Sequence, residues 1–393
     1  MKRALAALAR ELPGLKPNHI RKLIDAGIRD RKHVEDVIRG QSNGGRILSQ
    51  FMELPEQHLI EAMGWTGWPE YTGVTLSSPC PLGVLAPTDD IVKDANRSAV
   101  SASATTLPSH HSLLANYGPP VSQGSVGTCP SFTAVAIIEG QQSSCIDLSE
   151  RFNYSLTKAI DGHPDTDGSY LKFSTQVVTE HGVCREVTCP YVEDREVLRE
   201  RPSEEAFEEA IAYRAPSLPI RITPTDTKAI RGEIAAGHPV GLSLPLFNSS
   251  MYSLRFHNEG RLTMKLGWLD KVAGYHAMCA AAYLDNTYLT QHDFPEELGG
   301  GAFLVRNSWG TTWARNNPLA KFLGSGAGYA IVPFGYVQEY CFEAYTAVMN
   351  ARVQRRTNQQ IGESVRAFGA TWWSRTRNAV VTHARNRLAE LKQ

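Results

Sequence analysis

The segment "PPVSQGSVGTCPSFTAVAIIEG", Pro119–Gly140, places one cysteine between a glycine-rich loop and an apolar run with helical spacing. This run predicts a helix that begins at Cys129, and Pro130 suits the first turn of such a helix. Aligned peptide dipoles at a helix N-terminus favour negative charge, so they favour thiolate over thiol there. Cys129 is therefore the first candidate nucleophile of the chain.

The composition is that of a soluble globular chain without a dominant charge. Its 393 residues include 40 basic and 40 acidic side chains, and 42% of the residues are hydrophobic. This balance argues against nucleic-acid or membrane binding driven by the charge of the whole molecule. No apolar run approaches the ~20 residues that cross a bilayer. The basic start is interrupted by Arg10 and Glu11, so it predicts the first helix of a small domain rather than a signal peptide.

The seven cysteines are odd in number and include no CxxC pair. That pattern argues against a disulfide scaffold and a structural zinc site, so we expect no metal and no cofactor. Cys184 and Cys189 are close enough in sequence for a local disulfide. We expect Cys145 and Cys279 in the core, and free thiols overall, as in a cytoplasmic, bacterial protein.

Residues 1–73 predict a small all-helical domain. Apolar residues recur at helical spacing from Ile20 to Val37, and a second helical run covers residues 44–65. The first run resembles a helix-hairpin-helix, but Lys16 replaces the glycine that would let the backbone approach a phosphate. A death-fold-like adaptor that binds a protein partner and a plain packing module both stay open, and nucleic-acid binding is not expected.

Two further segments differ from the rest of the chain in composition. Residues 74–106 are rich in proline and then in small polar residues, which is typical of a linker. An extended inhibitory segment along a cleft is the alternative. Residues 348–393 are basic, with apolar residues at helical spacing. We expect a helical extension that packs on the body, and its binding to a membrane or a partner stays open.

The central part of the chain, residues 107–347, predicts an α+β fold. Helical patterns around 129–144 and 167–182 come first, and strand-like runs at 238–247, 276–284 and 301–309 follow. Helices followed by strands favour the α+β class over alternating βαβ units.

A cysteine nucleophile needs a base, a group that orients the base, and donors for the oxyanion. In "VAGYHAMCAAAYLD", His276 lies at the start of an apolar strand, and in "FLVRNSWGTTW", Asn307 lies at the end of another. Gln123 precedes Cys129 by six residues, across a glycine turn. The sequence thus contains a candidate for each role.

These motifs resemble those of the papain-like cysteine peptidases, the C1 family. The similarity extends over about residues 107–345, and the cysteine, histidine and asparagine follow the order and the ~130–150-residue separation of papain-like enzymes. The stretches that carry it are "LPSHHSLLANYGPPVSQGSVGTCPSF", "LSERFNYSL", "DTDGSYLKFSTQVVTEHGVCREVTCPY", "GYHA" and "NSWG" followed by Trp313. The resemblance implies a papain-like two-lobed domain, with a helical lobe and a β-barrel-like lobe.

The resemblance also implies a role for each candidate. Cys129 would be the thiolate nucleophile, kept at a low pKa by an ion pair with His276, which later protonates the leaving amine. Asn307 would orient the imidazole, and Trp309 would shield that contact from water. The side chain of Gln123 and the backbone N–H of Cys129 would form the oxyanion hole.

The same motifs imply one more position that contacts substrate, and at two positions this sequence departs from the family pattern. Gly168 corresponds to the place where the family presents backbone to an extended substrate. Pro130 stands where the family usually has tryptophan, so packing beneath the site must differ. Val126 stands where secreted members often carry a cysteine, which agrees with a reducing compartment.

The sequence therefore predicts a cysteine endopeptidase that cleaves proteins or peptides through a thioester at Cys129 and is recruited or regulated by residues 1–73. Transamidation, deamidation or deubiquitination would use the same acyl-enzyme and stay open as alternatives. A catalytically inactive scaffold is the third alternative.

Overall fold

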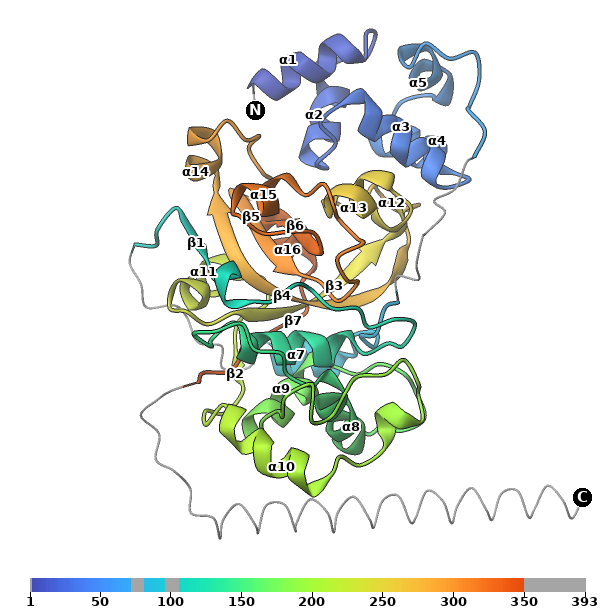
Figure 1. The fold of residues 1–393 in the computed structure, drawn as a ribbon. Helices are drawn as coiled ribbons and strands as arrows, with labels where there is room; N and C mark the ends of the chain where they lie inside the picture. The colour runs from blue at the N-terminus through green and yellow to red at the C-terminus, as the bar shows by residue number, and fades with distance from the viewer. Residues whose placement is uncertain (1, 72–80, 96–105, 350–393) are drawn as a thin grey trace, which may run out of the picture.

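The computed structural model describes residues 2–71, 81–95 and 106–349. Five helices come first, at the top of Figure 1, and a curved sheet with a helical layer below it follows. The α+β class predicted from the sequence is confirmed, with helices ahead of an antiparallel sheet. The basic extension predicted at 348–393 lies, from residue 350 onward, outside the described residues, and so do residues 72–80 and 96–105 of the predicted linker.

The N-terminal helices form a core of their own. They are α1 (Lys2–Glu11), α2 (Pro17–Asp25), α3 (Arg31–Gly40), α4 (Gly44–Met52) and α5 (Glu56–Ala62). The helical spacing of apolar residues puts Ile20 and Leu23 of α2 and Val34 and Val37 of α3 inside this core. Asp30 starts α3, because its side chain accepts a hydrogen bond from the backbone N–H of His33.

The sheet has seven strands, and every neighbouring pair is antiparallel. The strands are β1 (His110–Ser112), β2 (Ile220–Arg221), β3 (Val240–Phe247), β4 (Val272–Asp285), β5 (Gly301–Arg306), β6 (Tyr329–Pro333) and β7 (Glu343–Thr346). Their order is β2-β7-β3-β4-β5-β6, and β1 also pairs with β4. All residues of β3 and β5 are buried, as expected for strands that are covered on both faces.

The helical layer packs on the lower face of the sheet in Figure 1. Its helices are α7 (Cys129–Glu139), α8 (Glu150–Ile160), α9 (Leu171–Glu180) and α10 (Glu204–Ala210). Every residue of α7 is buried, because the helix lies between β4 on one side and α8 and α9 on the other.

Shorter elements complete the two lobes. The α-helical ones are α6 (Asp89–Ala95), α11 (Thr227–Ala235), α12 (Asn248–Met251), α13 (Leu254–Glu259), α14 (Asn286–Gln291), α15 (Pro318–Phe322) and α16 (Phe334–Tyr340). The single-turn 3-10 helices are η1 (Leu114–Asn116), η2 (Val197–Arg199) and η3 (Ile211–Tyr213). Among the described residues, no helix is long and apolar enough to cross a membrane.

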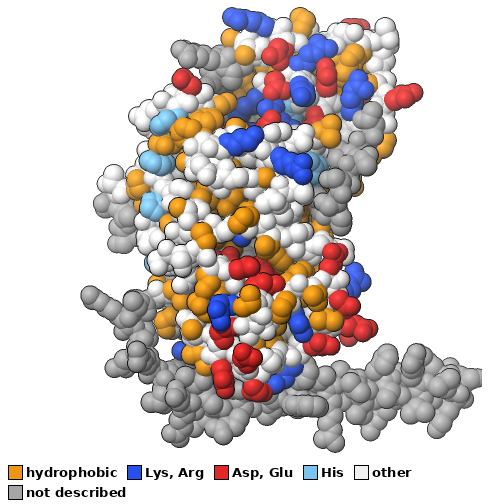
Figure 2. All heavy atoms as spheres, in the orientation of Figure 1, with side chains coloured by type: hydrophobic (Ala, Val, Ile, Leu, Met, Phe, Trp, Pro, Cys, Tyr) orange, Lys and Arg blue, Asp and Glu red, His pale blue; other side chains and the backbone are white. Residues whose placement is uncertain are grey.

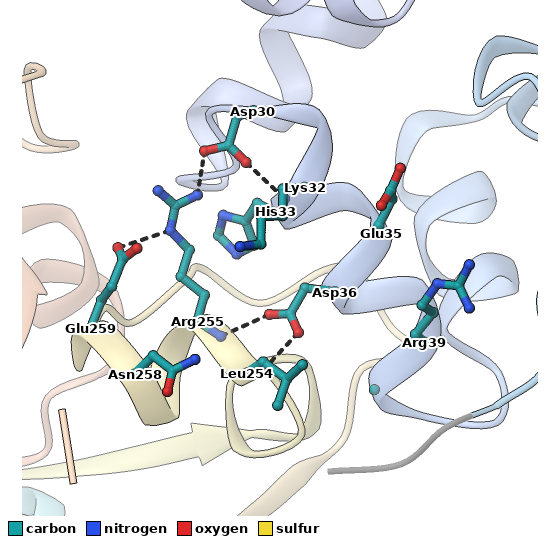
Figure 3. A pocket seen from close by; sticks show the side chains of 11 residues that line it. Asp30, Lys32, His33, Glu35, Asp36, Arg39, Leu254, Arg255, Asn258 and Glu259 are labelled. Atoms are coloured by element: carbon teal, nitrogen blue, oxygen red, sulfur yellow. Dashed lines mark hydrogen bonds and ion pairs between the residues drawn. The ribbon is translucent and has the colours of Figure 1, made fainter. Parts of the chain in front are cut away.

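The N-terminal helices dock on the β-rich lobe through charged hydrogen bonds (Figure 3). Asp36 of α3 accepts hydrogen bonds from the backbone N–H groups of Leu254, at 2.7 Å, and Arg255, at 3.0 Å. It thereby caps the first turn of α13 across the interface. The guanidinium of Arg255 in turn bridges Asp30 and Glu259. These contacts and the packing of Leu266 into the N-terminal core join the two parts.

The surface carries an acidic patch, and it also corrects one sequence prediction. Acidic side chains gather on the helical lobe, in the lower part of Figure 2. The exposed ones between residues 193 and 208 are Glu193, Asp194, Glu196, Glu200, Glu204, Glu205 and Glu208. The prediction that Cys145 lies in the core was wrong: it is exposed, because it lies in the irregular segment between α7 and α8, whereas Cys279 of β4 is buried.

Candidate active site

Cys129 is the first residue of α7 and is fully buried. Thr128 precedes it in a non-helical conformation, and Pro130 occupies the first turn, where its missing N–H costs no helical hydrogen bond. The backbone N–H of Ala277 donates to Cys129 Sγ at 3.5 Å. Because Ala277 follows His276 in β4, this contact brings the thiol next to the predicted base.

His276 lies in β4 opposite Leu244 of β3, and its ring is held by Asn307. The distance between His276 Nε2 and Asn307 Oδ1 is 2.7 Å. The same oxygen accepts the backbone N–H of Ser308 at 2.8 Å, so it acts as an acceptor and Nε2 carries the hydrogen. His276 Nδ1 is buried and has no hydrogen-bond partner among the described residues. It is the nitrogen left to exchange a proton.

Trp309 covers the contact between His276 and Asn307. Its ring stacks on the imidazole, with the centroids 4.8 Å apart and the planes at 28°. Trp313 and Phe256 both meet Trp309 edge-on, at 5.1 and 5.8 Å. This aromatic group fixes the indole and keeps water away from the hydrogen bond beneath it.

Gln123 is fully buried beside the start of α7. Its Nε2 donates to the carbonyl of Val126 at 2.8 Å, and its Oε1 accepts the hydroxyl of Ser308. Its backbone N–H also donates to Ser308 O at 2.9 Å. One of the two N–H donors of the amide is thus used, and the other is free to serve an oxyanion.

Gly168 lies at the cleft beside residues 83–85 of the same chain, and the neighbouring Ser169 makes the backbone hydrogen bonds to them. The substrate contact expected of Gly168 stays a prediction. The Ser169 N–H donates to Gly83 O at 3.0 Å, and Ser169 O accepts the Leu85 N–H at 3.2 Å. Gly168 has a positive φ of 86°, and a Cβ there would lie 2.5 Å from Gly83 O. Glycine is therefore required for the close approach.

The partner of this pairing is residues 81–88 of the same chain, which cross the active site in extended form. The Val84 N–H donates to Tyr275 O at 3.2 Å, so the segment lies between Ser169 and the residue before His276. Trp309 Nε1 donates to Pro81 O at 3.2 Å. The segment therefore occupies the cleft beside the nucleophile from one wall to the other.

Packing and charge hold this segment in place. Val84 and Ile91 join Cys129 in one apolar cluster. A Cβ on Gly83 would lie 2.2 Å from Gly127 O, so the segment passes in tight contact with the turn before Cys129. At the C-terminal end of α6, Arg221 donates to the carboxylate of Asp94 at 3.0 Å.

Burial sets the charge state of the covered site. Desolvation raises the pKa of the Cys129 thiol to about 12, although backbone N–H groups of Ala277, Gly83 and Val84 partly oppose the rise. Desolvation also lowers the pKa of the His276 imidazole to about 4. Both groups are therefore neutral at pH 7 while the cleft is covered. The thiolate–imidazolium pair implied by the sequence stays a prediction for an open cleft.

The sequence analysis missed three residues that contribute to the site. Ser169 and Tyr275 act through backbone atoms, which leave no signal in residue type. Ser308 connects Gln123 to Asn307 and was visible only as part of "NSWG". In the described ranges, no group of three or more His, Cys, Asp and Glu side chains could hold a metal ion.

Comparison with known proteins places this geometry in context. A family model described as "Papain family cysteine protease" matches residues 115–319. An uncharacterized peptidase C1-like protein of Acanthamoeba polyphaga mimivirus is 25% identical over 231 residues, which are 56% of this chain and 65% of that protein. A cathepsin L-like peptidase of Aedes aegypti is 26% identical over 229 residues, 53% of this chain and 59% of that protein. The chain thus spans less than two thirds of the length of either relative.

A solved structure supports the fold. Xylellain, a cysteine protease from Xylella fastidiosa, superimposes with a TM-score of 0.54 over 70% of this chain and 98% of that chain. The two sequences are 20% identical, so the likeness concerns the architecture alone.

Proposed function

This chain belongs to the papain family of cysteine proteases, and on that premise we propose that it is a cysteine endopeptidase with Cys129 as its nucleophile. The observation that carries the proposal is the assembled pair of His276 and Asn307, with Nδ1 unpaired and Cys129 Sγ bound by the next backbone N–H. A buried histidine kept in one tautomer beside a helix-terminal thiol is what nucleophilic catalysis requires.

The geometry supports a specific sequence of steps. His276 Nδ1 takes the proton of Cys129, and the thiolate attacks the carbonyl carbon of the scissile peptide bond. The resulting oxyanion accepts hydrogen bonds from the backbone N–H of Cys129 and the free N–H of Gln123 Nε2. The imidazolium then protonates the leaving amine, which leaves a thioester on Cys129. Water, deprotonated by His276, hydrolyses this thioester and restores the thiol.

The proposal includes the substrate. Ser169 and Tyr275 present backbone N–H and C=O groups that pair with residues 83–85. An extended peptide could use the same groups, because these hydrogen bonds do not depend on side chains. The substrate class that fits is thus an extended segment of a protein or peptide.

The proposal also includes latency. Residues 81–88 fill the place that a substrate would take, so the described form is closed and must open before it can cleave. This is the inhibitory alternative that the sequence analysis left open for residues 74–106. The capture of a separate protein partner by residues 1–73 stays a prediction, and so does a cytoplasmic location.

The test uses a substitution that the closed segment cannot accommodate. In Gly83→Val, the new side chain meets the backbone of Gly127 and should expel residues 81–88 from the cleft. Gly67→Val is the matched control, because a Cβ at Gly67 meets nothing within 4 Å. Both are compared with the unchanged protein and with Cys129→Ala.

Two readouts separate closure from chemistry. Limiting iodoacetamide near pH 6, followed by intact-mass analysis, should label Gly83→Val rapidly at one site and the Gly67→Val control slowly. The label should disappear when Cys129→Ala is added. A denatured protein substrate should be cut only by the opened enzyme, with new peptide termini found by mass spectrometry. Equal labelling of both valine variants would contradict latency, and fast labelling without cleavage would contradict endopeptidase activity.

A further inference from the structure

The turn that carries the oxyanion donor is held by a loop from another part of the helical lobe. The Tyr191 hydroxyl donates to Gln123 O at 2.8 Å and contacts the hydroxyl of Thr128 at 2.9 Å. Two residues later, the carboxylate of Glu193 accepts the backbone N–H of Ser125 at 2.6 Å. Residues 191–193 thus hold the turn 123–128 at three points.

Apolar packing strengthens the same connection. Val126 lies in a buried cluster with Tyr154 and Leu198, and Tyr191 packs against it. The sequence analysis noted Val126 as the position where secreted relatives often carry a cysteine. Here the turn has no covalent bond at that position, so the loop that carries Tyr191 adds to the hydrogen bonds by which Gln123 and Ser308 already hold it.

Two cysteines lie at the base of this loop. Cys184 and Cys189 are both buried, and their thiols lie close enough to shift each other's pKa. A single residue holds both backbones: the Ser149 N–H donates to Cys184 O at 2.9 Å, and the Ser149 hydroxyl donates to Cys189 O. A turn between them is closed by the Cys189 N–H donating to Arg185 O at 3.3 Å. The fold therefore holds the two cysteines close together at the base of the loop.

We propose that Cys184 and Cys189 form a reversible disulfide, so that the turn between them is a redox-modifiable site. The disulfide would stiffen the loop 184–193. Through Tyr191 and Glu193, it would also stiffen the turn 123–128. The modification does not depend on the activity of the protein. Only its consequence for catalysis rests on the proposed function.

The chemistry favours this pair over the other buried thiols. Interaction with Cys184 lowers the pKa of Cys189 and raises that of Cys184, so Cys189 is the more acidic thiol of the pair. Burial instead raises the pKa of Cys129, Cys279 and Cys341. Among the buried thiols, a small oxidant such as hydrogen peroxide should therefore react at Cys189 first.

The oxidation can be written with every atom accounted for. The Cys189 thiolate attacks one oxygen of hydrogen peroxide, the O–O bond breaks, and a sulfenic acid and hydroxide result. The sulfur of Cys184 then attacks the sulfenic sulfur, and the S–O bond breaks. The released hydroxyl takes the proton of Cys184 and leaves as water. The hydroxide from the first step takes up the proton that Cys189 released on ionising, so one peroxide becomes two waters. Two thiols lose two electrons in all, and an added dithiol reverses the reaction.

The experiment uses the full chain carrying Cys129→Ala, so that oxidation of the nucleophile cannot contribute. Treatment with one equivalent of hydrogen peroxide should reduce the intact mass by about 2 Da, and peptide mapping should find Cys184 linked to Cys189. Dithiothreitol should restore the mass. Added Cys184→Ser should abolish the linkage, whereas added Cys145→Ser, at an exposed cysteine, should leave it unchanged. No loss of mass, or a linkage between other cysteines, would overturn the proposal.

A separate measurement tests whether the disulfide stiffens the turn 123–128, and this measurement needs no further variant. Hydrogen exchange is compared between the oxidised and reduced forms of the same protein. We expect exchange at residues 123–128 to slow at least threefold, and the thermal midpoint to rise by roughly 3–6 °C. Slower exchange confined to residues 184–189 would overturn the connection to the nucleophile turn while leaving the disulfide itself established.

Discussion

His276 and Asn307 are joined by a 2.7 Å hydrogen bond between Nε2 and Oδ1, and this bond decides which nitrogen of the imidazole remains free. Asn307 Oδ1 cannot donate, so Nε2 keeps its hydrogen and Nδ1 keeps its lone pair. The stacked ring of Trp309 holds the imidazole in that plane. The orientation of the base is therefore built into the resting protein before any substrate arrives.

The first prediction concerns that orientation. Asn307→Ala, in the opened Gly83→Val background, should lower kcat by about 100-fold, because the imidazole can then turn away from Cys129. KM should change little, since Asn307 contacts the base and not the peptide. Steady-state hydrolysis measures both values. Asn258→Ala, at an exposed asparagine of α13, is the control. An unchanged kcat would show that Trp309 alone orients the ring.

The second prediction separates oxyanion stabilisation from thiolate formation. Gln123→Ala in the same background should lower kcat by about 100- to 1000-fold, because one oxyanion donor is lost. The rate of iodoacetamide labelling at Cys129 should stay within about twofold, because alkylation forms no oxyanion. Parallel hydrolysis and labelling assays test this. If both rates fall together, the side chain of Gln123 serves mainly to shape the turn before Cys129.

The third prediction concerns pH. Burial lowers the pKa of His276 to about 4. In Cys129→Ala, which has no thiolate to pair with the ring, we expect this pKa to return toward its ordinary value of 6.5 when residues 81–88 leave the cleft. The open form therefore binds more protons between these two values, so a falling pH favours opening. The gain reaches at most about 3 kcal/mol at pH 4. Hydrogen exchange of residues 81–88, corrected for the intrinsic rate, should accelerate from pH 7 to 4.5.

A matched variant tests whether His276 causes this pH dependence. His276→Asn removes the titrating ring while keeping a polar side chain of similar reach. In that variant, the corrected exchange of residues 81–88 should change little over the same pH range. If the acceleration persists, the pH dependence of opening does not come from His276.

The fourth prediction concerns the docking of the N-terminal helices. Asp36→Ala removes an acceptor shared by the Ser253 hydroxyl and the backbone N–H groups of Leu254 and Arg255. The free energy of unfolding should fall by about 1–2 kcal/mol, because these donors lose a charged partner at a half-buried site. Urea denaturation measures the change.

Glu35→Ala is the control for this substitution. Glu35 is next to Asp36 but pairs with Arg31 of its own helix, at 3.0 Å and partly exposed. Its removal should change the free energy of unfolding by no more than about 0.5 kcal/mol. Equal effects of both substitutions would mean that Asp36 acts within α3 and not across the interface.

Much of the fold could be read from local patterns in the sequence. The apolar run after Cys129 predicted a helix at 129–144, and α7 ends earlier, at Glu139, since the chain turns at Gly140. The run at 238–247 predicted β3 within two residues, because a strand buried on both faces is apolar throughout. The strand with His276 begins four residues before the predicted start, at Val272, where exposed residues hide the apolar pattern.

The sequence by itself determined the chemistry: a thiol at a helix start, an imidazole in an apolar strand, and an amide after the next strand, in the order typical of one family. Residue type and spacing carry that information. Only the tertiary structure decided that residues 81–88 pair with Ser169 and Tyr275, and that Ser149 holds the backbones of Cys184 and Cys189 together. The physical reason is that every residue except proline has the same backbone N–H and C=O, so no side chain indicates which distant backbone it will pair with.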